Sequence, residues 1–353
     1  MLIQENVPLA PLTTLGIGGP ARYFVRAETE QVVTDSLDFA ASRELPVFVL
    51  GGGSNILVSD AGFPGLVLRI ALTGTSFEDD GNHVKVTAAA GEDWDPLVAE
   101  VVRRNLAGIE CLSGIPGFVG GTPVQNVGAY GQEVSETITS VRALDHNSHQ
   151  VVDLSNSDCG FGYRKSIFNS SERDRYIVLE VIYRVERDGP PVIRYADLIR
   201  HFADRSDTPL LQEVRDAVRH IRLGKAMLLV PGDPDCRSAG SFFKNPVVSQ
   251  SEFDRITEAA RLARILAKDQ LPPHYPAGDG SIKLSAAWLI EKSGFSKGYA
   301  KGPVGLSSRH VLAIVNRGGA TARDAILLVD EIQSRVEASF GMRMVPEPMF
   351  VGF

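Results

Sequence analysis

The sequence of 353 residues is poor in cysteine and lacks the cysteine spacings that are typical of disulfide frameworks and redox motifs. Its three cysteines, at positions 111, 159 and 236, are odd in number and form no C-x-x-C pair. This pattern argues against a disulfide framework and favours free thiols in a reducing compartment. No apolar run approaches the roughly 20 residues of a membrane helix, and the first residues lack the basic and apolar regions of a secretory signal. We therefore expect a cytoplasmic protein.

An excess of positive charge is lacking as well, since 36 basic residues face 43 acidic ones. The formal net charge is −7, and the lysines and arginines are scattered rather than clustered. Nucleic acids and anionic membrane surfaces attract proteins through basic patches, so we expect neither as a partner. An anionic ligand must then be held by a few local cations. The hydrophobic content of 44% supplies enough core for two or three domains, and we find no internal repeat.

Glycine, in contrast, is abundant, and it is concentrated in CLSGIPGFVGGTPVQNVGAYG at positions 111–131. Each glycine disfavours a helix or strand by about 1 kcal/mol relative to alanine. Apolar residues nevertheless recur through the stretch, so it is not a solvated linker. A buried glycine-rich backbone offers amide N–H groups to a phosphate or to the edge of a flavin ring. The alternative is an irregular crossing of an α/β core.

Two further glycine clusters differ in their context. GGGSN at 51–55 lies between predicted strands at 46–50 and 56–58, an arrangement that can present several N–H groups to one anion. GIGGPA at 16–21 matches the G-x-G-x-x-A dinucleotide fingerprint, which requires a strand before it and a helix after it. Prolines precede it and a β-type run, Ala21–Arg26, follows it. We therefore expect a turn entering the first strand, and no Rossmann domain.

Capping residues and apolar periodicity predict the other elements. We expect helices at about 30–43 after Thr29, from Asp93 to Gly108, from Thr208–Pro209 to Gly224, from Ser249 to about Lys268, at 285–293 and at 322–340. We expect strands at 83–88, 138–144, 150–154, 177–186 and 311–315. His146 and His149 flank the turn of the predicted hairpin at 138–154, where a solvated turn is expected rather than a metal site because no third ligand is near.

Three polar residues far apart in the sequence are candidates for chemistry. Arg164 lies between aromatic residues, and its planar fork suits a carboxylate, although it could simply stack on Phe161 or Tyr163. Ser241 follows two small residues, a setting in which serine is usually a turn residue. Glu347 lies among apolar residues that would raise its pKa, but it could equally be a surface carboxylate near the C-terminus.

The motifs GGGSN at 51–55, SGIPG at 113–117 and NVGAYG at 126–131 resemble those of the UDP-N-acetylenolpyruvoylglucosamine reductases, and the resemblance covers nearly the whole chain. It implies an α+β protein with a vanillyl-alcohol-oxidase-type two-part FAD-binding fold and a separate α/β substrate-binding domain. The implied domains are FAD-binding subdomain 1 at 1–72, to which 344–353 return, subdomain 2 at 73–226 and the substrate-binding domain at 227–343.

The resemblance also implies a reaction and a set of site residues. An NADPH-dependent flavoenzyme would reduce the enolpyruvyl ether of UDP-N-acetylglucosamine-enolpyruvate to UDP-N-acetylmuramate for peptidoglycan. Arg164 in FGYR, Ser241 in GSFFKNP and Glu347 match the family's catalytic residues. Tyr195, Lys225 and Asn245 match substrate-binding positions in the subgroup that has a substrate-covering tyrosine loop. The expected FAD-binding residues are Gly51, Gly52, Gly53, Ser54, Asn55, Ile115, Pro116, Gly117, Gly120, Gly121, Asn126, Gly128 and Tyr130.

Two positions depart from the family pattern: Pro348 follows Glu347, and the segment between Lys225 and Ser241 is longer than usual. We expect FAD to be non-covalent, NADPH and substrate to share one site in turn, and the protein to be a monomer without a metal. Two alternatives stay open. One is an FAD-dependent oxidase or dehydrogenase of a sugar or hydroxy acid on the same scaffold, and the other is a flavin- or nucleotide-binding module without turnover.

Overall fold

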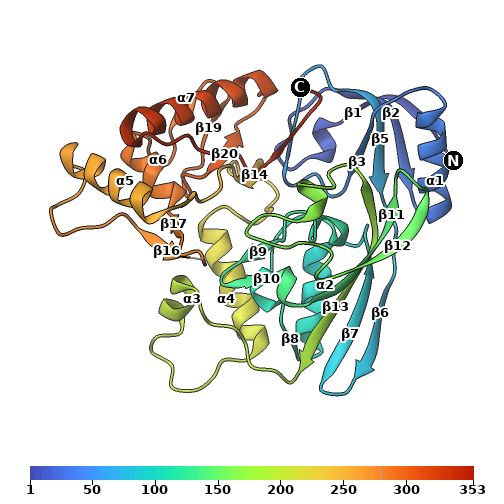
Figure 1. Cartoon of the computed structure of the whole chain (residues 1–353), viewed down its shortest axis with the longest axis horizontal. Helices are drawn as coiled ribbons and strands as arrows, with labels where there is room; N and C mark the ends of the chain where they lie inside the picture. Colours follow the sequence, from blue (N-terminus) through green and yellow to red (C-terminus); the bar gives the residue numbers. More distant parts are fainter. Residues whose placement is uncertain (279) are drawn as a thin grey trace. The chain divides into compact units, whose positions relative to one another are not determined.

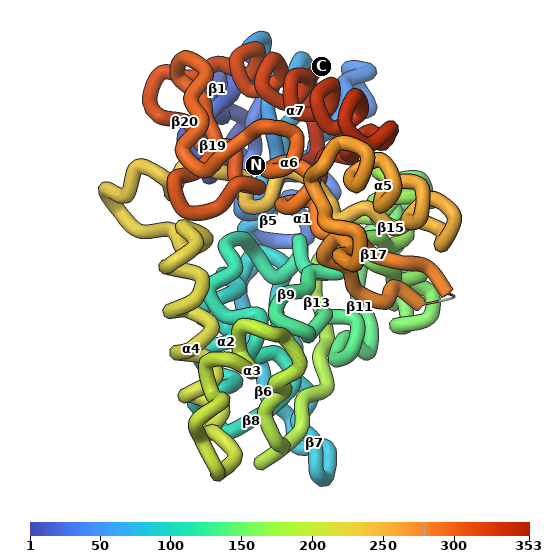
Figure 2. The backbone as a smooth tube through the Cα atoms, turned by 90° about the vertical axis from the view of Figure 1, so that its left-hand side faces the viewer, coloured from blue at the N-terminus to red at the C-terminus, as the bar shows by residue number. Residues whose placement is uncertain are grey.

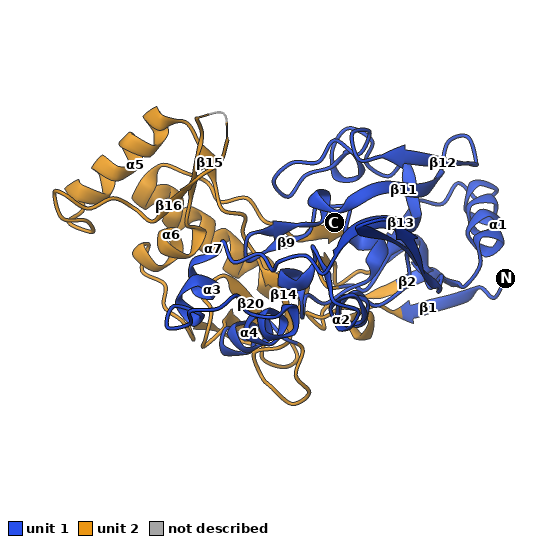
Figure 3. Ribbon diagram, turned by 90° about the horizontal axis from the view of Figure 1, so that it is seen from below, with its two compact units in different colours: residues 1–7, 21–53, 63–228 blue, residues 8–20, 54–62, 229–353 orange. Residues whose placement is uncertain are grey.

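The computed structural model describes residues 1–278 and 280–353, and the chain divides into two compact units (Figure 3). Unit 1 consists of Met1–Val7, Ala21–Gly53 and Phe63–Leu228, and unit 2 of Pro8–Pro20, Ser54–Gly62 and Leu229–Phe353. The boundary passes through the GGGSN loop, so that Gly51–Gly53 belong to unit 1 and Ser54 and Asn55 to unit 2. The three-part domain division stays a prediction.

The N-terminal part of unit 1 is a sheet in the order β1-β2-β5-β3, with helix α1 beside it (Figure 1). Strand β5 lies in the middle and pairs in parallel with both β2 and β3. Its residues Leu66, Val67 and Leu68 are all buried, as is expected of a strand that is covered on both faces. These elements are β1 (Gln4–Pro8), β2 (Pro20–Ala27), α1 (Glu30–Ala41), β3 (Val47–Leu50) and β5 (Phe63–Ile70).

The rest of unit 1 is an antiparallel sheet in the order β12-β11-β13-β7-β6, with β8 paired to β13. Helix α4 contacts both α2 and α3, and the three helices are drawn to the left of this sheet in Figure 1 and towards the viewer in Figure 2. The elements are β6 (Thr75–Asp80), β7 (His83–Ala89), α2 (Trp94–Arg103), β8 (Leu106–Ala107), β9 (Gly128–Ala129), β10 (Gln132–Glu133), β11 (Ile138–Asp145), β12 (Gln150–Ser155), β13 (Tyr176–Arg187), α3 (Ala196–His201) and α4 (Leu211–Gly224).

Unit 2 has its own core, formed by helices α5, α6 and α7 against short strands. Its sheets run β14-β20-β19-β18 and β15-β17-β16, and the C-terminal strand β21 pairs in parallel with β4. The elements are β4 (Ile56–Val58), β14 (Ser238–Ser241), β15 (Val247–Val248), α5 (Gln250–Leu262), β16 (His274–Pro276), β17 (Ile282–Leu284), α6 (Ala286–Lys292), β18 (Ala300–Lys301), β19 (Val304–Leu306), β20 (Ala313–Asn316), α7 (Ala322–Phe340) and β21 (Met349–Val351).

Several predicted caps are confirmed. The Thr29 hydroxyl accepts a hydrogen bond from Val32 N, and Ser249 and Glu252 form a capping box at the start of α5. Helix α7 spans the predicted residues and ends at Gly341 in the left-handed conformation, with φ of 64°. The hairpin around His146 and His149 is present as β11 and β12.

Other predicted boundaries are wrong for identifiable reasons. Helix α2 begins as predicted, with Asp93 as its N-cap residue, although the Asp93 side chain accepts no capping hydrogen bond. The helix ends at Arg103 rather than Gly108, since Asn105 adopts a left-handed φ of 56°. Helix α4 does not begin at Pro209 but at Leu211, where the carboxylate of Glu213 accepts from Leu210 N.

Two further boundaries differ from the prediction, and one strand was not predicted. Helix α5 ends at Leu262 rather than near Lys268, since Arg264 adopts a left-handed φ of 57°. Strand β20 starts at Ala313 rather than Val311 because a turn precedes it, and β1 comes before the strand expected to be first.

Candidate active site

The two glycine-rich segments meet within unit 1. A Cβ atom on Gly52 would lie 2.6 Å from the Cα atom of Gly117, so only glycine lets these backbones approach so closely. A Cβ on Gly51 or Gly121 would meet no atom within 4 Å, which leaves open space beside the contact. The surrounding residues Ile115 and Pro116 are half-buried. A narrow, glycine-walled cradle of this kind fits a phosphate or a flavin edge.

Not every predicted cofactor residue faces open space. The amide of Gly120 already donates to the Ala90 carbonyl, and a Cβ on Gly120 would lie 2.6 Å from the Cβ of Ala90. A Cβ on Gly128 would lie 2.7 Å from the Cγ of Glu133. Gly120 and Gly128 therefore permit the glycine-rich segment to pack closely against Ala90 and Glu133.

Three predicted site residues in unit 1 adopt positive φ angles although they are not glycine. The values are 45° for Asn126, 49° for Tyr130 and 53° for Arg164. Such a conformation is uncommon for tyrosine and arginine and costs of the order of 1–3 kcal/mol where it is strained. Strained backbone tends to be retained at functional sites, where the surrounding contacts enforce it.

Asn126 supplies some of these contacts. Its side-chain nitrogen donates to Glu133 Oε2 at 2.8 Å and to the Gly162 carbonyl at 3.0 Å, while its oxygen accepts from Ser135 N at 3.1 Å. The side chain is buried. Asn126 thus ties the glycine-rich segment to the turn that carries Arg164.

Arg164 lies in a tight turn in which Gly162 and Lys165 exchange both backbone hydrogen bonds. Its Nη2 atom donates to the Gly128 carbonyl at 2.7 Å, and its guanidinium carbon lies 5.4 Å from the ring centroid of Tyr163. Arg164 as a whole residue is half-buried. The turn and the two contacts fix the orientation of the Arg164 guanidinium group, and a fixed orientation favours bidentate binding of a planar carboxylate.

A second group in unit 1 contains Tyr130, Tyr195 and Lys225. The two tyrosine rings pack edge to face with centroids 5.4 Å apart, and the Lys225 ammonium lies 5.8 Å and 6.0 Å from them. Lys225 Nζ also pairs with the Asp197 carboxylate at 2.5 Å. Tyr195 remains 37% exposed. Two aromatic faces and one ammonium form a surface suited to the ring and phosphates of a nucleotide.

The sequence analysis missed Arg222, which lies in the last turn of α4. Its Nε and Nη2 atoms donate to the carbonyls of Gly114 and Met227 at 3.2 and 2.7 Å. Burial lowers the pKa of the Arg222 guanidinium, and interactions with Tyr130 and Asp95 oppose that effect. A desolvated cation therefore lies beside the SGIPG segment. The spacing of Arg215, Arg219 and Arg222 along one helix face was the available signal.

In unit 2, Ser241 and Glu347 lie on neighbouring stretches of backbone. Glu347 N donates to the Phe242 carbonyl at 2.9 Å, and Lys244 N donates to the Val345 carbonyl at 3.0 Å. Phe242 is fully buried, and both Ser241 and Glu347 are half-buried. Two residues separated by 106 positions in the sequence are therefore held next to one another.

Two asparagines that were predicted as site residues form hydrogen bonds with the backbone in this part of unit 2. Asn55 Nδ2 donates to the Glu347 carbonyl at 3.3 Å, and the Asn55 carbonyl accepts from Met349 N at 3.0 Å. Asn245 Oδ1 accepts from Ala286 N at 2.9 Å, at the start of α6. The carbonyl of Ser54 accepts a long hydrogen bond of 3.4 Å from the Thr14 hydroxyl.

Sequence reasoning also missed His310. Its Nε2 atom lies 3.4 Å from the Ser241 hydroxyl oxygen. His310 precedes β20 by three residues, and Ser241 pairs with Ala313 in that strand. No local pattern around position 310 points to this contact, because it arises from long-range strand pairing.

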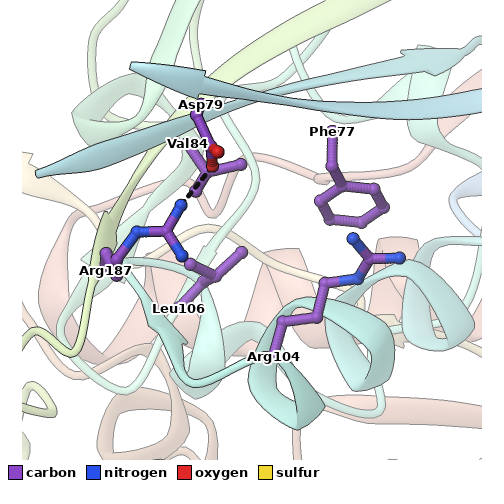
Figure 4. A pocket seen from close by; sticks show the side chains of 6 residues that line it. All are labelled: Phe77, Asp79, Val84, Arg104, Leu106 and Arg187. Atoms are coloured by element: carbon purple, nitrogen blue, oxygen red, sulfur yellow. Dashed lines mark hydrogen bonds and ion pairs between the residues drawn. The ribbon is translucent and has the colours of Figure 1, made fainter. Parts of the chain in front are cut away.

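A separate hollow of about 460 Å³ in unit 1 is lined by Phe77, Asp79, Val84, Arg104, Leu106 and Arg187 (Figure 4). Both of its guanidinium groups already have partners, since Arg187 pairs with Asp79 and Arg104 lies 3.8 Å from the Phe77 ring centroid. None of these lining residues was predicted as a site residue. In the described part of the chain we find neither a cluster of three or more metal ligands nor a helix long and apolar enough to span a membrane.

Comparison with known proteins agrees with this picture. Residues 21–155 match the family model of the FAD binding domain, and residues 233–351 match that of the UDP-N-acetylenolpyruvoylglucosamine reductase C-terminal domain. The reductase of Thermobifida fusca is 48% identical over 352 residues, which cover 99% of this chain and 98% of that protein. The reductase of Streptomyces avermitilis is 47% identical over 355 residues, which cover 99% of this chain and 96% of that protein.

Solved structures agree as well. The crystal structure of the reductase from Thermus caldophilus aligns with a TM-score of 0.66 and 27% identity, covering 99% of this chain and all of that one. A solvent-stable cholesterol oxidase aligns at a TM-score of 0.50 and 14% identity over 98% of this chain and 86% of its own, a likeness of fold alone. The expected α+β class with a vanillyl-alcohol-oxidase-type FAD-binding part is confirmed. The chain belongs to the UDP-N-acetylenolpyruvoylglucosamine reductase family and is an FAD-dependent oxidoreductase.

Proposed function

We propose that Arg164, Ser241 and Glu347 carry out the chemistry of this reductase. The reaction follows from family membership: the chain reduces the enolpyruvyl ether of UDP-N-acetylglucosamine-enolpyruvate to UDP-N-acetylmuramate, with NADPH as reductant, in peptidoglycan synthesis. Bound FAD supplies the hydride that reaches the methylene carbon of the enolpyruvyl group. The protein's residues must then stabilise the charge that develops and deliver a proton.

Arg164 and Glu347 are assigned to the developing charge. Hydride addition at the methylene carbon places negative charge on the neighbouring carbon and its carboxylate. A guanidinium fork that is already oriented by the Gly128 carbonyl can receive that carboxylate without reorganisation. Glu347, if protonated, would add a second donor. Preorganised donors of this kind favour the transition state over the ground state.

Ser241 is assigned as the proton donor to the carbon next to the carboxylate. The observation that supports this role most directly is the hydrogen bond from Glu347 N to the Phe242 carbonyl. This hydrogen bond keeps the Ser241 hydroxyl and the Glu347 carboxyl on adjacent backbone segments, so that both can contact the enolpyruvyl group. The buried Phe242 and Phe243 rings beside Ser241 limit access of water.

Tyr195, Lys225 and Asn245 are assigned to holding the UDP-sugar, as in the subgroup with a substrate-covering tyrosine loop. The two tyrosine faces and the ammonium of Lys225 support this assignment. Arg222, beside Gly114, adds positive charge near the glycine cradle. NADPH and the UDP-sugar would occupy the same place in turn.

FAD should be bound without a covalent link, in a cytoplasmic monomer. Burial raises the pKa of the Cys111 thiol, whose sulfur donates to the Val192 carbonyl at 3.1 Å. A protonated, buried thiol is a poor nucleophile. Acid precipitation should therefore leave the yellow colour in the supernatant, whereas a yellow pellet would contradict the assignment.

The proton-donor role can be tested by separating the two half-reactions. Ser241→Ala should leave flavin reduction by NADPH nearly unchanged and slow reoxidation by the enolpyruvyl substrate by about 10²–10⁴-fold, the usual effect of a positioned acid. Ser241→Cys should recover part of the rate, since a thiol can also donate a proton. Equal slowing of both half-reactions in stopped-flow traces would contradict the role.

A further inference from the structure

The long segment between α4 and β14 is folded against the turn that carries His310. Within the segment, Asp233 N donates to the Val230 carbonyl at 3.1 Å, Cys236 N donates to the Asp233 carbonyl at 3.2 Å, and Val230 N donates to the Cys236 sulfur at 3.1 Å. These bonds close the segment into a compact loop. The loop orients two carboxylates, those of Asp233 and Asp235, towards one turn of unit 2.

Asp235 is the centre of this contact. Its Oδ2 atom accepts from the Ser307 hydroxyl at 2.9 Å, from Ser308 N at 2.9 Å and from the Ser308 hydroxyl at 2.7 Å. Arg309 pairs with Asp233, and its Nε lies 3.6 Å from Asp235 Oδ2. Asp235 is only 7% exposed and Ser307 is fully buried. A buried carboxylate with three donors and a nearby cation is held rigidly. We call the contact of Asp233 and Asp235 with residues 307–309 the clasp.

The clasp determines where His310 lies. The Ser307 hydroxyl that donates to Asp235 also accepts from Arg309 N at 3.1 Å and from His310 N at 3.3 Å. Downstream, Ala313 N donates to the His310 carbonyl at 3.1 Å, and Phe242 N donates to the Leu312 carbonyl at 2.7 Å. The backbone of His310 is thus fixed on both sides, with its imidazole 3.4 Å from Ser241.

We propose that His310 is a positioning residue for Ser241, held by the Asp233 and Asp235 clasp; this inference rests on the proton-donor role proposed above. The Nε2–H group donates to the Ser241 oxygen, so that the serine proton is directed away from the imidazole and towards the substrate carbon. When the serine O–H bond breaks and the new C–H bond forms, the same donor stabilises the oxygen that has lost its proton. That oxygen regains a proton from water before the next turnover.

The first test uses His310 variants in both half-reactions. His310→Ala should slow reoxidation of the flavin by the enolpyruvyl substrate by about 10–100-fold, the effect of losing one donor to a developing oxyanion, and leave reduction by NADPH unchanged. His310→Gln keeps an N–H donor and should recover most of the rate. Loss of rate in both half-reactions, or no recovery with glutamine, would overturn the proposal.

A double-mutant cycle shows whether His310 acts through Ser241. In the Ser241→Ala background, His310→Ala should cause no further slowing. The same factor in both backgrounds would mean that His310 acts independently. If Ser241→Ala did not slow reoxidation selectively, the proton-donor role of Ser241 would be contradicted. If Ser241→Ala slowed reoxidation selectively but His310→Ala did not, only the positioning role of His310 would be contradicted.

A readout independent of turnover is the tautomer of the imidazole. In the FAD-free protein, ¹⁵N NMR of His310 should show Nε2 carrying the proton, and Ser241→Ala should shift that resonance. A protonated Nδ1 with a bare Nε2, or an unchanged resonance in the serine variant, would contradict the hydrogen bond.

The clasp is tested with Asp235→Ala and a matched control. Asp60 also accepts from backbone amides of unit 2, those of Ala322 and Arg323 at the start of α7, at 2.7 and 3.0 Å. Asp235→Ala should shift the His310 resonance and slow reoxidation selectively, whereas Asp60→Ala should lower stability without altering either. Equal effects of the two substitutions would contradict a specific role of the clasp.

Discussion

The side-chain nitrogen of Asn55 lies 3.3 Å from the main-chain carbonyl of Glu347, 292 residues later in the sequence. Strand β4, which begins directly after Asn55, pairs in parallel with β21, which begins two residues after Glu347. The end of the GGGSN motif and the C-terminal acid are therefore held together within unit 2. This relationship gives the motif a structural role in addition to the expected contact with FAD.

Asn55→Ala should weaken that link. The loss of one hydrogen bond corresponds to about 0.5–1.5 kcal/mol of unfolding free energy, measured by urea denaturation. Because Glu347 would be less constrained, reoxidation by the enolpyruvyl substrate should slow more than reduction by NADPH. Asn105→Ala, which removes an exposed hydrogen bond to Asp188, is the control and should leave both half-reactions unchanged. Unaltered kinetics in Asn55→Ala would argue that the link does not position Glu347.

The glycine cradle can be tested with two neighbouring alanines. Gly52→Ala places a Cβ 2.6 Å from the Gly117 backbone and should destabilise the FAD-free protein by about 1–3 kcal/mol, as overpacking does. Gly51→Ala places its Cβ in open space and should leave the FAD-free protein as stable as wild type. Titration with FAD should nevertheless show weaker binding by Gly51→Ala, since the new methyl group fills the expected cofactor space. Normal FAD affinity in that variant would remove Gly51 from the cofactor site.

Asp95 should make unit 1 sensitive to acid. Burial raises the pKa of this carboxyl, but hydrogen bonds from Arg215 and Gly114 N and the charge of Arg219 outweigh that effect, so the net pKa lies below the ordinary value of 3.8. A carboxyl with a lowered folded pKa contributes stability above its unfolded pKa, and that stability is lost as pH falls through the folded pKa. Unfolding free energy should therefore decline below about pH 4.

Asp95→Asn should remove this contribution. It leaves the buried Arg215 without its anionic partner and should cost about 3 kcal/mol at neutral pH, with a flatter dependence on pH between 2 and 4. Asp80→Asn is the control, because Asp80 pairs with Arg184 at the surface and exposed pairs contribute little. If both variants showed the same pH profile, Asp95 would not be the group that titrates.

Local patterns in the sequence predicted local structure well. The caps at Thr29 and Ser249 and the hairpin around positions 146–149 depend on residues a few positions apart, so their chemistry is visible in a short window. The end of α2 could not be predicted in this way, because Asn105 leaves the helical conformation and Leu106 pairs with Arg187 of the distant strand β13. The contacts of Asn55 with Glu347 and of Ser241 with His310 also arise from pairing between remote strands.

The last prediction concerns Lys225 and the UDP-sugar. Lys225 pairs with Asp197 at 2.5 Å and faces the rings of Tyr130 and Tyr195. If its ammonium binds a phosphate, Lys225→Met should raise the Kd of the UDP-sugar about tenfold, equivalent to about 1.4 kcal/mol. Arg200→Met is the matched control, because Arg200 pairs with the same Asp197 at 3.5 Å while its side chain is 78% exposed. Titration calorimetry should show a weaker complex for the first variant and an unchanged one for the second. If both variants bound the UDP-sugar equally weakly, the effect would come from the loss of a cation beside Asp197. It would then not come from the loss of a group that binds the phosphate.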